Sequence, residues 1–445
     1  MFGKILIANR GEIALRIIRA ARELEVDTVC VYSEADANAP WLELADETVC
    51  IGKAPSSESY LRIDRIISAA EMTDSDAIHP GYGFLAENAH FAAICRDCEI
   101  EFIGPSPEAM GLLGDKINCK RLAKKAGTPI FPGTDGEIEE LDEAVKVASE
   151  IGYPVIVKAT AGGGGKGMRI ARNVAGLRTA VTAAQQEAIA SFGNGAVYLE
   201  KFLESARHIE VQVLGDKHGN AVHLFNRDCT SQRRHQKLIE EGPAPGVSSE
   251  IRDRVCASAA ELIRKANYSG AATVEFLMNK EQEFFMLEVN TRVQVEHPVT
   301  EMITGVDIVK ESICVAAGEP LSWKQEDIRL NGHAIECRLN AEDPSNNFMP
   351  QPGIIETWQL AGGPGVRIES HVRPGYRIPP NYDSMIGKLI VHGRNRDEAI
   401  ARMRAALGEM KIGPIATTIP LHQRLLNHHA FVSADFDINW VERLL

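Results

Sequence analysis

The chain has 445 residues, of which 44% are hydrophobic and 24% are charged, and its formal net charge is −13. This length predicts about two to four domains, and the composition is ordinary for a soluble globular protein. The negative charge disfavours general binding to nucleic acid or to an anionic membrane, and no segment approaches the roughly 18 apolar residues needed to cross a bilayer.

The first part of the chain alternates strand-like and helix-like segments. They follow one another at residues 4–8, 14–21, 28–32, 63–70, 77–80 and 101–104. Such alternation predicts a parallel, doubly wound sheet over about residues 1–115. The turn after the first strand reads Asn9-Arg10-Gly11 and lacks the glycine triplet of a nicotinamide dinucleotide site, which argues against that cofactor.

The N-terminus and the cysteines bear on the cellular compartment. The chain begins with a strand-like segment and lacks the architecture of a signal peptide. Its nine cysteines are scattered, and only Cys95 and Cys98 have the spacing of a metal or redox pair. No second pair completes a zinc site, so we expect these two on one face of a helix that ends near Glu99. Isolated thiols are typical of a reducing cytoplasm, where we expect the protein to reside.

A glycine-rich loop follows an expected helix at residues 116–126 and an apolar strand that ends at Lys158. Residues 161–168 read Ala-Gly-Gly-Gly-Gly-Lys-Gly-Met. Glycines permit positive φ and let backbone N–H groups approach an anion, and the flanking lysines add positive charge. The pattern favours phosphate binding over a flexible surface loop, although it is not a Walker loop.

Two carboxylates lie on neighbouring apolar segments within a strand-rich region, residues 198–287 and a little beyond. Residues 273–277 and 285–290 read as an antiparallel hairpin that carries Glu275 and Glu288 among hydrophobic neighbours. Because a buried carboxylate is costly without a partner, a divalent cation is a natural one. With the amide of Asn290, these hard oxygen ligands suit Mg²⁺ that bridges nucleotide phosphates. The alternative is a pair of edge-exposed glutamates.

Polar side chains continue directly after this hairpin. Alternation places Asn290, Arg292, Gln294 and Glu296 on one face of an expected extended segment. A cation, an amide and a carboxylate beside a metal are what binding a small oxyanion and removing its proton require. An exposed strand edge with mixed polar residues is the alternative interpretation.

Two further polar segments stand out. The basic cluster at residues 232–237 is either a solvated turn or part of an anion site, since the protein as a whole is acidic. On an expected strand at residues 332–342, Glu336 and Arg338 share a face, and an arginine there usually pairs with a carboxylate. The rest of the tail begins with strand-like segments and ends with helical ones, such as residues 396–410.

Together these segments closely resemble the biotin carboxylase family of the ATP-grasp ligase superfamily. The resemblance covers essentially the whole chain and is most specific in residues 227–237 and 288–301. It implies a fold of the α/β and α+β classes. The implied units are a Rossmann-like N-terminal domain at residues 1–115, an ATP-grasp domain at 116–330 with a mobile lid at about 131–203, and a mixed α/β C-terminal domain at 331–445.

The resemblance also implies a role for each candidate site residue. Contacts to ATP would come from Lys116, Lys158, Gly164, Gly165, His208, Gln232 and His235, with Glu200, Lys201, Phe202 and Leu203 as a hinge around the adenine. Metal ligands would be Glu275, Glu288 and Asn290. Bicarbonate would contact Lys237, Arg292, Gln294 and Val295, with Glu296 as its base and Arg338 facing the ureido oxygen of biotin.

The implied reaction is carboxylation of biotin by bicarbonate and ATP, with Mg²⁺ or Mn²⁺, through carboxyphosphate. This is the first half-reaction of acetyl-CoA carboxylase, on the path to malonyl-CoA and fatty acids. The implied partners are a biotin carboxyl carrier protein, carboxyltransferase subunits and a second copy of the chain in a homodimer. The alternatives are the same subunit of a propionyl-CoA or pyruvate carboxylase, another ATP-grasp carboxylate ligase, and a non-catalytic scaffold that keeps the fold.

Biotin is expected as a substrate and not as a prosthetic group of this chain. The only near match to a biotin attachment sequence is Met410-Lys411, and Gly413-Pro414 after it reads as a helix stop, not a hairpin tip. Only 34 residues follow Lys411, and they look partly helical, which is too little for a biotinyl domain.

Overall fold

The N-terminal sheet is parallel, as the alternation of segments predicts. In the computed structural model, which describes residues 1–138, 140–160 and 168–445, this sheet has five strands in the order β3-β2-β1-β4-β5. The strands are β1 (Lys4–Ile7), β2 (Asp27–Ser33), β3 (Glu47–Gly52), β4 (Ala77–His79) and β5 (Glu101–Phe102), and the helices are α1 (Gly11–Glu23), α2 (Ile63–Met72) and α3 (Ala89–Asp97). The Rossmann-like prediction is confirmed, and α3 ends, as expected, beside Cys98.

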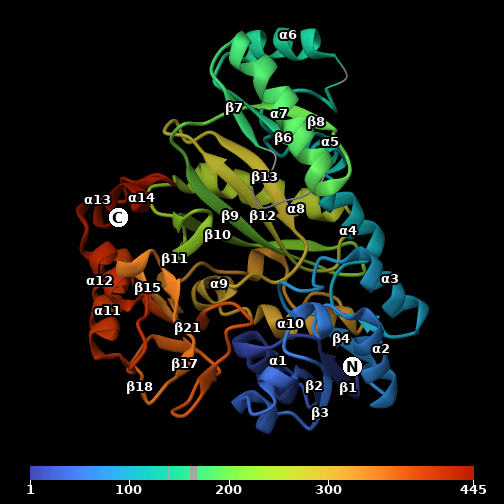
Figure 1. Ribbon diagram of the computed structural model, residues 1–445, viewed down its shortest axis with the longest axis vertical. Coiled ribbons are helices and arrows are strands. Elements are labelled where there is room, and N and C mark those ends of the chain that lie inside the picture. The colour runs from blue at the N-terminus through green and yellow to red at the C-terminus, as the bar shows by residue number, and fades with distance from the viewer. Residues whose placement is uncertain (139, 161–167) are drawn as a thin grey trace.

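A small lobe stands at the top of the molecule (Figure 1). Helices α4 (Pro107–Gly114) and α5 (Lys116–Ala126) lead to it, and its three-stranded sheet has the order β7-β6-β8. The elements are α6 (Leu141–Ile151), β6 (Val155–Ala159), β7 (Arg169–Ala171), α7 (Val174–Phe192) and β8 (Val197–Lys201). Val157, Leu177 and Leu199 belong to a hydrophobic cluster confined to the lobe. A unit with its own core is suited to move as a rigid body, as a lid does.

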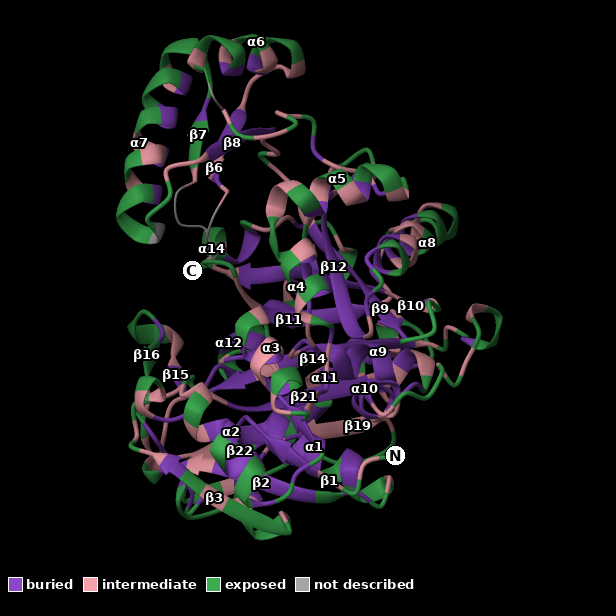
Figure 2. Ribbon diagram, turned by 90° about the vertical axis from the view of Figure 1, so that its right-hand side faces the viewer, coloured by how far each residue is buried: buried purple, intermediate pink, exposed green. Residues whose placement is uncertain are grey.

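The central sheet has eight strands in the order β13-β12-β9-β10-β11-β14-β21-β19, and its neighbours are antiparallel. Its strands are β9 (Arg207–Gly215), β10 (Ala221–Arg233), β11 (Gln236–Gly242), β12 (Gly270–Met278), β13 (Phe284–Asn290), β14 (His333–Asn340), β19 (Val366–Glu369) and β21 (Met385–Gly393). Because β11 pairs with β14, hydrogen bonding crosses the division that the sequence predicts at residue 330. Figure 2 shows these strands as the buried centre of the molecule.

The remaining elements cover the central sheet and extend it toward the C-terminus. The helices are α8 (Ser249–Lys265), α9 (His297–Thr304), α10 (Ile308–Ala316), α11 (Arg396–Glu409), α12 (Ile419–Asn427), α13 (His429–Ser433) and α14 (Trp440–Leu444). The short strands are β15 (Glu342–Asp343), β16 (Met349–Pro350), β17 (Gly353–Ile354), β18 (Thr357–Gln359), β20 (Arg377–Ile378) and β22 (Lys411–Gly413). Helix α11 ends at Glu409, and Lys411 begins strand β22, where it pairs with Gln359.

One continuous core joins the N-terminal sheet to the central sheet and the C-terminal helices. Its buried members include Ile17 on α1, Ile239 on β11, Val309 on α10, Leu389 on β21 and Met403 on α11. These parts therefore form a single packed base beneath the separate lobe. Among the described residues, no helix is both long enough and apolar enough to span a membrane.

A buried carboxylate ties the central sheet to the C-terminal helices. Glu241 on β11 accepts hydrogen bonds at 2.7 and 3.0 Å from the Arg396 guanidinium, and its Oε2 lies 2.9 Å from Nε2 of His333. Burial alone would raise the pKa of Glu241, but His333 and Arg396 outweigh it and lower that pKa to about 2. A carboxylate with a lowered pKa stabilises the fold above the pKa of the unfolded chain and loses this effect as pH falls.

We predict that Glu241→Gln lowers the free energy of unfolding by about 3 kcal/mol at pH 7, because the ionised partner of Arg396 is lost. The difference from the wild type should narrow as pH falls from about 5 toward 2. Urea unfolding followed at several pH values measures this difference. The control is Glu108→Gln, which removes an exposed carboxylate paired with Arg96 and should change little. A wild-type difference that stays constant down to pH 3 would contradict the assignment.

Candidate active site

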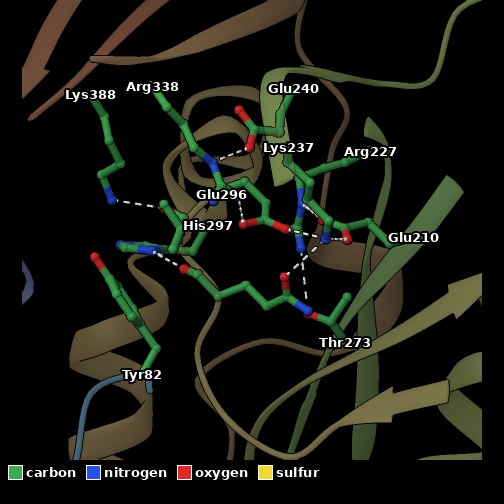
Figure 3. A network of polar contacts seen from close by, with 12 residues as sticks. Tyr82, Glu210, Arg227, Lys237, Glu240, Thr273, Glu296, His297, Arg338 and Lys388 are labelled. Carbon is green, nitrogen blue, oxygen red and sulfur yellow. Dashed lines mark hydrogen bonds and ion pairs between the residues drawn. The ribbon is translucent and has the colours of Figure 1, made fainter. Parts of the chain in front are cut away.

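Lys237 is the centre of a buried polar network on one face of the central sheet (Figure 3). Its Nζ lies 2.6 Å from Glu210 Oε2, 2.6 Å from Glu296 Oε1 and 3.0 Å from Glu275 Oε1, and 3.2 Å from Gln294 Oε1. These residues come from three strands and from the segment after β13. One ammonium group therefore gathers three carboxylates that are far apart in sequence.

A fully buried arginine supports this network from within the sheet. Arg227 on β10 donates from Nε to Glu210 at 2.6 Å and from one terminal nitrogen to Gln212 at 2.8 Å and Thr300 at 2.7 Å. Sequence reasoning missed Glu210. The available signal was the alternation of His208, Glu210 and Gln212 with apolar residues along β9, which places the three on one face.

Glu296 is held between two cations. Arg338 on β14 donates to Glu296 Oε2 at 2.9 Å and to Glu240 Oε1 at 2.6 Å, while Lys237 contacts the other Glu296 oxygen. Burial acts to raise the pKa of Glu296, but Lys237 and then Arg338 outweigh it, so that pKa lies well below its usual range. Glu296 is therefore ionised, and the predicted pairing of Arg338 with a carboxylate is confirmed.

The predicted carboxylate hairpin is confirmed, with β12 and β13 antiparallel. Glu275 stands opposite Glu288 in the register, and Thr273 opposite Asn290. Glu275 Oε2 lies 3.0 Å from Nε2 of His208, and its Oε1 accepts from Asn290 Nδ2 at 3.0 Å. The side chain of Glu288 reaches solvent, although desolvation by the surrounding protein and then the charge of Glu275 raise its pKa. Two glutamates opposite each other on neighbouring strands, with the Asn290 side chain beside Glu275, are ligand types that suit a divalent cation.

The expectation of an extended segment after the hairpin is wrong. Strand β13 ends at Asn290, and residues 291–296 form an irregular segment with a turn before α9. The turn brings Gln294 and Glu296 to Lys237, whereas Arg292 lies elsewhere. Its guanidinium contacts Asn290 Oδ1 at 3.2 Å and Glu87 Oε2 at 2.9 Å.

Three of the expected nucleotide-binding residues, Lys116, Lys158 and Glu200, lie on α5 and on two strands of the lobe. Lys158 on β6 and Lys120 on α5 contact the two oxygens of Glu200, at 2.6 and 2.8 Å. Lys116, at the start of α5, is half-buried, and burial lowers its pKa. Sequence reasoning missed Lys120, which lies one helical turn beyond Lys116, on the same face of α5.

The other candidates for nucleotide contact are dispersed around this region. Lys201 Nζ contacts the backbone carbonyls of Gly152 and Tyr153 at 2.9 and 3.1 Å, within the lobe. Phe202 and Leu203 are half-buried directly after β8, Gln232 is buried on β10, and His235 is exposed in the turn between β10 and β11. Gly164 and Gly165 lie outside the described residues.

A cavity of about 470 Å³ opens beside Arg338. Its wall includes Arg10 and Tyr82, which follow strands β1 and β4, together with Val295 from the irregular segment and Asp383 near β21. This volume lies in the range of small-molecule sites. The guanidinium that holds Glu296 thus also faces a space that a second small ligand could enter.

Comparisons with known proteins agree over the whole chain. Family models described as the biotin carboxylase N-terminal domain, the ATP-binding domain of the carbamoyl-phosphate synthase L chain and the biotin carboxylase C-terminal domain match residues 1–110, 115–324 and 336–443. The chain is 55% identical to Biotin carboxylase 1 of Bacillus subtilis (strain 168), covering 99% of this chain and 98% of that protein.

Solved structures give the same result. A biotin carboxylase–β-γ-ATP complex from Campylobacter jejuni superposes with a TM-score of 0.95 at 50% identity, covering 100% of this chain and 99% of that one. The biotin carboxylase domain dimer of Hydrogenobacter thermophilus 2-oxoglutarate carboxylase, with MgADP, ADP and bicarbonate, gives 0.93 at 47% identity, covering 100% and 98%. The chain belongs to the biotin carboxylase family of ATP-dependent ligases.

Proposed function

We propose that this chain activates bicarbonate with MgATP and transfers the carboxyl group to biotin on a separate carrier protein. The observation that carries the proposal is Glu296, an ionised carboxylate held between Lys237 and Arg338, the second of which lines a cavity. A small anion binds where cations converge, and an ionised carboxylate beside it is the form that accepts a proton. The bicarbonate in the Hydrogenobacter thermophilus structure supports the same ligand here.

Glu296 gains basicity when bicarbonate binds. The two cations that lower the pKa of Glu296 also attract the incoming anion, so bicarbonate competes with Glu296 for them. Losing part of that stabilisation raises the pKa of Glu296 and makes it a better acceptor for the bicarbonate proton. Lys237 and Gln294, which are in contact, then hold the anion for in-line attack, and Arg292 joins them when the anion draws its guanidinium away from Glu87.

The attack on ATP forms a bond from a bicarbonate oxygen to the γ-phosphorus and breaks the bond to the β–γ bridging oxygen. ADP leaves, and carboxyphosphate remains. Lys116 and Lys158 are placed to contact phosphates, with Glu200 and Lys201 near the adenine and the lobe as a lid that excludes water. Mg²⁺ or Mn²⁺ held by Glu275, Glu288 and Asn290 would supply charge neutralisation at the phosphates. His208, bound to Glu275, orients one of these ligands.

Carboxyphosphate then breaks its bond between the carboxyl carbon and the phosphate oxygen, which gives CO₂ and phosphate beside biotin. The phosphate takes the proton of a ureido nitrogen, and that nitrogen bonds to the carbon of CO₂. Arg338 lines the cavity, and a guanidinium there stabilises negative charge on the ureido oxygen while the nitrogen loses its proton. Arg338 thus stabilises the Glu296 carboxylate in the first step and the ureido oxygen of biotin in the second. A buried arginine stays charged throughout, which a residue with both tasks requires.

The carboxyl acceptor downstream is acetyl-CoA, with carboxyltransferase subunits as partners and the cytoplasm as the compartment. A 2-oxoglutarate carboxylase among the solved relatives makes another acceptor the competing proposal. We also propose that the units are residues 1–115, 116–330 with a lid at 131–203, and 331–445. Assay of biotin transfer to a purified carrier with each acyl or keto acid acceptor system distinguishes the acceptors.

The decisive experiment measures ATP cleavage by the purified chain with bicarbonate, with and without free biotin. We expect cleavage to require bicarbonate and to accelerate with biotin, because biotin consumes carboxyphosphate. The same preparation should carry no covalent biotin, since Lys411 lies in strand β22 and not at a turn. ATP cleavage that ignores both bicarbonate and biotin would favour another ATP-grasp ligase, and avidin binding that Lys411→Arg abolishes would overturn the carrier assignment.

We predict that Glu296→Gln lowers kcat by ~10²–10⁴-fold, because the amide cannot accept the bicarbonate proton. ATP affinity should stay near the wild-type value, since the carboxylate contacts Lys237 and Arg338 and not the lobe. The matched control is Glu311→Gln, a buried carboxylate that accepts from Ser322, outside the Lys237 network. Normal turnover by Glu296→Gln would show that the base lies elsewhere.

A homodimer is the expected assembly, since the Hydrogenobacter thermophilus relative is a dimer. Sedimentation equilibrium at micromolar protein should give twice the chain mass of 48.7 kDa. A single species at the chain mass over that concentration range would argue against the dimer.

A further inference from the structure

Lys388 is a fully buried lysine that joins three distant segments of the chain. Its side chain has 0% exposure, and its Nζ donates to the backbone oxygen of Val295 at 2.7 Å. The same nitrogen lies 3.2 Å from Oε1 of Glu12, whose side chain is 2% exposed. Burying an ammonium costs several kcal/mol unless its partners are well placed, so the positions of Val295 and Glu12 relative to Lys388 matter for stability. Figure 3 shows Lys388 beside Glu296 and Arg338.

The irregular segment depends on side chains to fix its backbone. Residues 291–296 are outside any described strand, so their carbonyls lack the ladder partners that a sheet supplies. The carbonyl of Gln294 instead contacts His297 Nδ1 at 2.7 Å, and the carbonyl of Val295 contacts Lys388 at 2.7 Å. Two adjacent carbonyls immediately before Glu296 are thus held by side chains.

Glu12 is itself anchored. It lies in the first turn of α1, where the helix dipole favours a negative charge, and it accepts a hydrogen bond from the Tyr82 hydroxyl. Tyr82 also lines the cavity beside Arg338. A line of contacts therefore runs from the cavity wall through Glu12 and Lys388 to the peptide that carries Glu296.

We propose that Lys388, held by Glu12, is a positioning residue that sets the Val295–Glu296 peptide for bicarbonate binding. This inference rests on the function proposed above. In a planar trans peptide, the direction of the Val295 carbonyl fixes the opposite direction of the Glu296 N–H and the position of the Glu296 Cα. Without the Lys388 ammonium, the Val295 carbonyl loses its hydrogen-bond donor and the peptide can rotate, which displaces Glu296. A displacement of about 1 Å at a reacting group lowers the rate by up to about 100-fold.

The test is the bicarbonate dependence of ATP cleavage in Lys388→Met, measured at saturating ATP and free biotin. Methionine fills the buried space but cannot donate to Val295. We expect the KM for bicarbonate to rise at least about tenfold, while the KM for ATP changes less than about twofold. A merely structural role would lower kcat or the amount of folded protein without this split between the two substrates.

Two further variants keep the test decisive. Glu12→Gln keeps an acceptor for Lys388 but removes the charge, and should raise the KM for bicarbonate by less than Lys388→Met does. Lys217→Met is the matched control, because Lys217 likewise donates to a carbonyl, that of Ala316 at 2.7 Å, and pairs with Glu101 at 2.8 Å, outside the Lys237 network. It should leave the KM for bicarbonate unchanged.

A folded Lys388→Met enzyme with the wild-type KM for bicarbonate overturns the inference. If Lys388→Met does not fold, an unchanged KM for bicarbonate in Glu12→Gln overturns the inference instead. Wild-type protein that cleaves ATP without any need for bicarbonate would mean that the proposed function has failed, which is distinguishable because it appears before any substitution is made.

Discussion

The site depends on the mutual neutralisation of opposite charges inside the central sheet. Arg227 is fully buried, and Glu210 and Glu296 are nearly so, which is tolerable only because each charge has a partner within about 3 Å. Removing one charged side chain of this network leaves its partners as unpaired charges in a medium that solvates them poorly. This constraint explains why the strands must be in register: Lys237 reaches three carboxylates only if β9, β11 and β12 keep their relative positions.

Under the proposed function, the same constraint would make the site responsive to an anion. Lys237 and Arg338 are shared among carboxylates and are not committed to one partner, so an incoming oxyanion exchanges contacts and does not have to create them. Glu240 illustrates the balance, since burial raises its pKa to about 7 even though Arg338 contacts it. A change in one charge of the Lys237 network therefore alters the pKa of the neighbouring groups.

Sequence patterns with a short period were enough to predict much of the fold and part of the site. Period-two alternation placed Glu275 and Glu288 on a hairpin, and the alternating strands and helices gave the parallel sheet. The failures share a cause. The turn that replaces the expected strand depends on contacts with Lys237, Arg338 and Lys388, which are tens of residues away in the chain. The contact of Lys388 with Glu12 joins segments hundreds of residues apart, and no local pattern records either kind of packing.

The division of the molecule into a continuous base and a separate lobe follows from the chemistry proposed for it. Positioning a small anion requires groups fixed to a fraction of an ångström, and the base supplies them because one core joins its sheets. Enclosing a nucleotide requires a part that opens and closes, and under the proposed function that part is the lobe, which has its own core. Glu200 on β8 pairs with Lys120 on α5, which packs against the base, and with Lys158 on β6, so these buried ion pairs connect the lobe to the base.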